Sequence, residues 1–135
     1  MPPSVRKVVD ALGDPPRLPG VRDERGGIRR ELVVNVLEGR WATAGVTAVP
    51  GSAVDGIGRD GVAVRVEAGR AHTNNEGVVA VLEAAIDPRV SYLVLIVPEE
   101  YKGSVTAARV VERVERLFTS PGVMLDLQGV AVVAY

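Results

Sequence analysis

Apolar residues recur three and four positions apart in four stretches of the chain. This spacing predicts amphipathic helices over 4–12, 28–39, 74–86 and 104–117. Ser4 and Ser104 are expected to cap the first and the last of them, and Gly13 to end the first. Residues 73–76 have the spacing of a capping box before the third helix. Asp87 and Pro88 are expected to terminate that helix.

Other stretches consist of small and β-branched residues and are bounded by turn residues. This composition predicts strands. Those over 41–49, 53–57 and 62–68 form an expected three-stranded antiparallel meander with a tight hairpin at residues 58–61. The run 90–97 is almost continuously apolar, as in a strand that is buried on both faces. A last short strand is expected over 130–135.

The order of these elements predicts an α/β (α+β) fold with a single mixed β-sheet flanked by helices. Residues 14–27 are rich in proline, glycine and charges of both signs and show no periodicity. We therefore divide the chain into an N-terminal helix with a flexible lead-in over 1–26 and an α/β domain over 27–135. The packed core is expected to begin near Gly27.

The third predicted strand carries two polar residues on one face. Arg65 and Glu67 are two positions apart, so they point the same way, while valines occupy the opposite face. Whether Asp55 joins them depends on the hairpin. A three-residue loop that ends at Gly61 pairs Asp55 with Arg65 and places all three on one face, whereas a two- or four-residue loop moves Asp55 to the other face.

The order of these features resembles that of the PD-(D/E)XK nuclease superfamily, and of the BglII-type restriction endonucleases in particular. It comprises an acidic residue on a helix, an aspartate at the end of a strand, a polar pair on the next strand, a crossover helix and a buried strand. The residues concerned are Glu31, Asp55, Arg65 and Glu67, and the resemblance extends over 27–117, including the segments 62–69 and 90–98.

The resemblance implies a Mg²⁺-dependent endonuclease that hydrolyses DNA phosphodiester bonds. In it Asp55 and Glu67 are metal ligands, Glu31 is the outer acidic residue, and Arg65 or Arg70 contacts phosphate. Two cuts in one duplex would require a homodimer. The alternative is a nuclease fold without catalysis that acts in nucleic-acid or protein binding and assembly.

The chain departs from the family pattern at one position. Arg65 stands where a second metal-ligating carboxylate is expected, and a guanidinium cannot bind a cation. A shifted assignment, with Glu67 as ligand and Arg70 as the cation, breaks the two-residue spacing. Asp55 and Arg65 also suit a simple cross-strand ion pair worth about 0.2–1 kcal/mol. Either the site binds metal through Asp55, Glu67 and Glu31, or the chain no longer cuts DNA.

Composition narrows these alternatives. The 135 residues contain no cysteine, which excludes disulfides, a Cys-ligated zinc site and a cysteine nucleophile. The net charge of −1 argues against a surface that binds nucleic acid throughout, although a local basic patch remains compatible with it. His72 is the single histidine. A lone histidine without a fixed partner is more often a surface or capping residue than a general base, and we expect the same of His72. No stretch is long and apolar enough for a membrane, so we expect a cytoplasmic protein.

Overall fold

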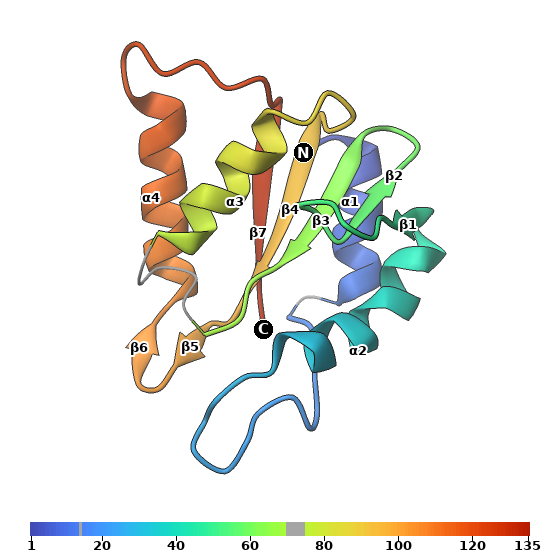
Figure 1. Ribbon diagram of the computed structural model, residues 1–135, viewed down its shortest axis with the longest axis vertical. Helices are drawn as coiled ribbons and strands as arrows, with labels where there is room; N and C mark the ends of the chain where they lie inside the picture. Colours follow the sequence, from blue (N-terminus) through green and yellow to red (C-terminus); the bar gives the residue numbers. More distant parts are fainter. Residues whose placement is uncertain (14, 70–74) are drawn as a thin grey trace.

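The computed structural model describes residues 1–13, 15–69 and 75–135, which form four helices, a main sheet and a small two-stranded sheet (Figure 1). The helices and strands follow in the order α1 (Pro3–Leu12), α2 (Arg30–Thr43), β1 (Val46–Ala48), β2 (Gly56–Gly58), β3 (Val62–Val66), α3 (Glu76–Ala85), β4 (Tyr92–Val97), β5 (Glu100–Tyr101), β6 (Ser104–Val105), α4 (Ala107–Thr119) and β7 (Gly129–Ala134).

The main sheet has five strands in the order β1-β2-β3-β4-β7. The first three are antiparallel neighbours, and β3, β4 and β7 run parallel. Helices α1 and α2 lie on one side of this sheet and α3 and α4 on the other (Figure 1). The predicted fold class, a mixed sheet flanked by helices, is confirmed at this level.

A separate hydrophobic core fills each side of the sheet. One contains the buried side of α1 and α2 and the even-numbered residues of β3, among them Val64; the other contains α3, α4 and the odd-numbered residues of β4, among them Leu93. The first core includes Val5 and Leu12 of α1, so it begins well before Gly27, where the sequence predicted it to start. No helix in the described ranges has both the length and the apolar character that crossing a bilayer requires.

Several element boundaries differ from the predicted ones. Helix α2 continues through Gly39 to Thr43 because Trp41 is 1% exposed and packs into the core, and this burial outweighs the low helix propensity of glycine. The prediction that a strand begins at residue 41 is wrong, since β1 begins at Val46. Ser4 lies inside α1 after Pro2, and Ser104 lies in β6, so neither caps a helix. Of the predicted capping box, residues 73 and 74 lie outside the described ranges, and Asn75 is the N-cap residue of α3 but makes no capping hydrogen bond through its side chain.

The hairpin between β2 and β3 has the register that the three-residue loop predicted. Gly56 pairs with Val64 and Ile57 with Ala63, which places Gly58 opposite Val62. Gly61 has a φ of +77°, and a Cβ added there would lie 2.7 Å from Ser91 Oγ. Only glycine suits both the left-handed backbone and the close approach of the segment before β4.

Candidate functional site

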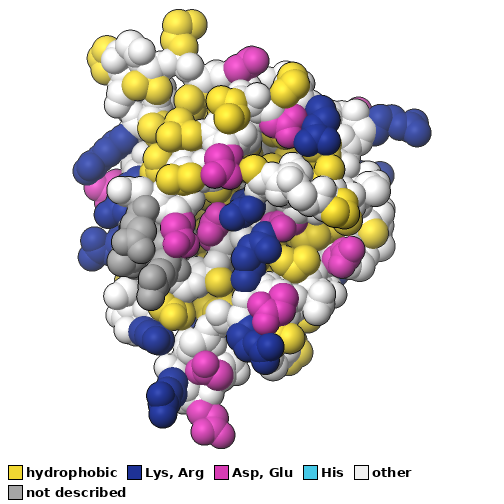
Figure 2. Space-filling model, viewed as in Figure 1, with side chains coloured by type: hydrophobic (Ala, Val, Ile, Leu, Met, Phe, Trp, Pro, Cys, Tyr) yellow, Lys and Arg dark blue, Asp and Glu magenta, His cyan; other side chains and the backbone are white. Residues whose placement is uncertain are grey.

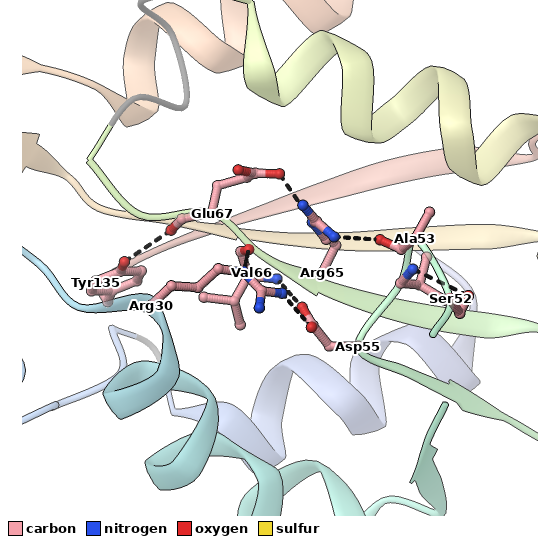
Figure 3. Close-up of polar contacts among 9 residues, drawn as sticks. Arg30, Ser52, Ala53, Asp55, Arg65, Val66, Glu67 and Tyr135 are labelled. Carbon is pink, nitrogen blue, oxygen red and sulfur yellow. Dashed lines mark hydrogen bonds and ion pairs between the residues drawn. The ribbon is translucent and has the colours of Figure 1, made fainter. Parts of the chain in front are cut away.

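The predicted site residues gather around the end of β3, but they form two separate ion pairs. Figure 3 shows Arg65 and Glu67 on the side of β3 that faces α3, and Asp55 with Arg30 on the side that faces α2. Each carboxylate already has an arginine partner. The single patch expected for Asp55, Arg65 and Glu67 is therefore divided between the two sides of the strand.

The first pair hydrogen-bonds to the end of β3, beyond the last residue that pairs with β2. Asp55 immediately precedes β2, and its Oδ2 accepts a hydrogen bond of 2.7 Å from the backbone N–H of Val66. Arg30 of α2 contacts Asp55 Oδ1 and donates from Nε to the Val66 carbonyl oxygen over 2.9 Å. One side-chain pair thus satisfies both backbone groups of Val66, as a neighbouring strand would.

The second pair is more deeply buried. Glu67 is 5% exposed, and its Oε1 accepts a hydrogen bond of 3.1 Å from Arg65 Nε, while Arg65 Nη1 donates to the carbonyl oxygen of Ala53 over 2.6 Å. The Glu67 backbone carbonyl accepts from the Tyr135 hydroxyl at 2.9 Å. Burial raises the pKa of the Glu67 carboxyl, and the guanidinium of Arg65 opposes this shift.

A cavity of about 370 Å³ opens between β3 and α3 beside the second pair. Its polar lining consists of two arginines and three glutamates: Arg30, Arg65, Glu67, Glu76 and Glu83. Figure 2 shows acidic and basic side chains interspersed over this face. A cavity lined by more acids than bases does not attract a phosphate from a distance.

Glu31, the remaining candidate among the described residues, joins neither pair. Glu31 lies in the first turn of α2, is paired with Arg29 at 3.1 Å, and both side chains are more than half exposed. Hydrogen bonds from the backbone at the helix start, then from Arg29, lower the pKa of Glu31. Arg70 and His72 lie outside the described residues.

Sequence reasoning missed Arg30. The resemblance calls for an acid on α2 and therefore points to Glu31, the neighbour of Arg30. The helix instead turns Arg30 towards β3 and Glu31 towards solvent. No local signal singles out Arg30, because it lies among several arginines at the start of the helix and its contact with Asp55 joins residues 25 positions apart.

The carboxylates do not fit a divalent cation as they are arranged. Both oxygens of Asp55 are engaged, Oδ1 by Arg30 and Oδ2 by Val66, and one oxygen of Glu67 is engaged by Arg65. Across the described ranges, no three carboxylate or histidine side chains gather closely enough to hold a metal ion. A Mg²⁺ ion bound by Asp55 would have to displace Arg30 or the N–H of Val66, and one bound by Glu67 would lie beside the guanidinium of Arg65.

Comparisons with known proteins add no relative: no protein-family model, curated protein or solved structure matches this chain.

Proposed function

We propose that this chain is a PD-(D/E)XK-like domain that has lost metal-dependent hydrolysis and acts as a binding or assembly module. The proposal is supported by the order of elements around the site. A helix with Glu31 is followed by Asp55 before β2, the Arg65 and Glu67 pair at the end of β3, the helix α3 and the buried strand β4. This is the order on which the resemblance to the nuclease superfamily rests.

One observation carries the loss of hydrolysis: Asp55 has a structural task. Together with Arg30 it satisfies the buried backbone of Val66, which is fully shielded from solvent. An aspartate used in this way is not free to bind a metal ion. Arg65 neutralises the remaining acid, Glu67. Asp55 is therefore engaged in the fold and Glu67 is ion-paired, and neither offers a free charge that a hydrolytic metal requires.

The charge balance favours a protein partner over DNA for such a module. The chain carries 16 basic and 17 acidic residues, and the cavity at the site has more acids than bases. Nonspecific DNA binding depends on clustered cations that release counterions from the phosphates. DNA binding would show itself as a strong dependence of affinity on salt.

The test is a nicking assay on supercoiled plasmid with and without Mg²⁺ or Mn²⁺, together with thermal unfolding in the same ions. We expect no nicking and no rise in Tm, because an ion stabilises a protein only if it binds the native state. Metal-dependent nicking by the wild-type protein that disappears in Asp55→Ala and Glu67→Ala would overturn the proposal and support the nuclease.

A charge-swapped variant tests whether Arg65 is the cause. Arg65→Glu combined with Glu67→Lys places an acid where the family pattern expects one and keeps an ion pair at the end of β3. The single substitution Arg65→Glu would instead set two acids together and endanger folding. Nicking gained by the double variant would locate the defect at positions 65 and 67. A folded double variant without activity would show that the loss does not rest on these two positions alone, as expected if Asp55 is held by the fold.

A further inference from the structure

The two edges of the main sheet differ in how they are protected. β1 is three residues long and is soon followed by Pro50, and short strands and prolines are devices that prevent an edge from pairing with another chain. β7 is six residues long, Gly129–Ala134, and contains neither a charge nor a proline. It lacks the protection that β1 has.

The outer backbone groups of β7 have no partner in the described part of the chain. β7 is the last strand of the sheet, and its ladder runs to β4 alone. Within residues 1–13, 15–69 and 75–135, no other backbone group and no side chain hydrogen-bonds to the backbone of 129–134. Such an edge is a template for a further strand.

Helix α4 places apolar side chains beside this open edge. Val110 and Val114 face the sheet, and Arg113 hydrogen-bonds to Asn75 at the start of α3 over 2.9 Å, which identifies the side of α4 that faces α3. At about 100° per residue, Val111 and Phe118 lie on the opposite side of the buried stripe. Helix α3 packs on β4 and α4 packs on β7, the edge strand. The side of α4 that faces away from α3 is therefore the side of the open edge.

These apolar side chains are exposed to solvent, although burial would be favourable for them. Val111 is 37% exposed and Phe118 is 41% exposed. In the connection that leads into β7, Val123 is 41% and Met124 is 95% exposed. An unpaired strand edge and neighbouring exposed apolar residues together are typical of a protein interface. We call this surface, formed by 129–134 with Val111, Phe118, Val123 and Met124, the β7 edge surface.

We propose that the β7 edge surface binds a second copy of this chain, with the two β7 strands paired antiparallel in one continuous sheet. The proposal does not depend on the proposed function. A strand without charges can pair with its own copy without placing like charges opposite each other. The two-fold axis keeps both α4 helices on the same face of the joined sheet, and antiparallel helices bring Val111 of one copy near Phe118 of the other.

The first test measures the mass of the protein by sedimentation equilibrium over a wide range of concentration. We expect a monomer–dimer equilibrium that Phe118→Ser weakens at least about tenfold, as truncation of a central aromatic side chain does in other interfaces. Leu82→Ser is the matched control, because Leu82 is also 41% exposed but lies on α3. A strictly monomeric wild-type protein, or a dimer weakened by Leu82→Ser and not by Phe118→Ser, would overturn the proposal.

The second test asks whether the strands themselves pair. Amide hydrogen exchange of 129–134 is compared in concentrated and dilute protein. The outward N–H groups should exchange more slowly in the dimer, while those of β1, at the opposite edge of the sheet, should exchange at the same rate in both samples. A dimer in which the exchange of β7 does not change with concentration would place the interface elsewhere.

Discussion

The Arg30–Asp55 and Arg65–Glu67 pairs lie at the same end of β3 and stabilise it in different ways. In the first, both charged groups also hydrogen-bond to the backbone of Val66, so the pair replaces part of a missing strand. In the second, the acid is buried more deeply: the side chain of Glu67 is 6% exposed, against 14% for Asp55 in the first pair. One pair closes a sheet edge, and the other neutralises a charge that the fold has buried.

This difference predicts which substitution is the most damaging. Arg65→Met removes the one cation that hydrogen-bonds to Glu67 among the described residues and leaves a buried carboxylate without its ion-pair partner. We expect the free energy of unfolding to fall by about 3–5 kcal/mol at neutral pH. Denaturant unfolding monitored by circular dichroism measures the change.

The matched control for this prediction is the double variant Arg65→Met, Glu67→Gln, which removes both charges. It should recover most of the lost stability, because the penalty comes from the uncompensated charge and not from the missing contact. A double variant as unstable as Arg65→Met alone would mean that packing or the hydrogen bond from Arg65 to the Ala53 carbonyl provides the stability.

The first pair should show a smaller effect that depends on hydrogen-bonding capacity. Asp55→Ala leaves the buried N–H of Val66 without an acceptor and should lower the free energy of unfolding by about 2–3 kcal/mol. Asp55→Asn keeps an acceptor oxygen and should lose clearly less. Glu31→Gln, in the exposed Arg29–Glu31 pair, serves as the control and should leave the denaturation midpoint unchanged. Equal losses in the Ala and Asn variants would contradict the strand-replacing role.

The register of the β2–β3 hairpin could be predicted from the sequence, and the position of the Asp55 carboxylate could not. The loop length and Gly61 are local, so they determine which residues pair. Asp55 lies one residue before β2, where the alternation of the pleat no longer applies, and its partner Arg30 comes from a helix 25 residues away. Trp41 shows the same limit: its burial extends α2 past a glycine that local pattern treats as a stop.

The smallest predicted effect is the pH dependence of the second pair. Burial raises the pKa of Glu67 above its ordinary value of 4.5, so the folded protein holds this proton more tightly than the unfolded chain. The resulting stabilisation is fully present below pH 4.5 and is lost as the pH rises through the folded-state pKa. Glu67→Gln lacks this titration. Wild-type protein should therefore lose stability relative to Glu67→Gln between pH 4 and pH 7 in paired denaturation curves. The opposite slope would mean that Arg65 outweighs burial and that Glu67 is held as a charged partner.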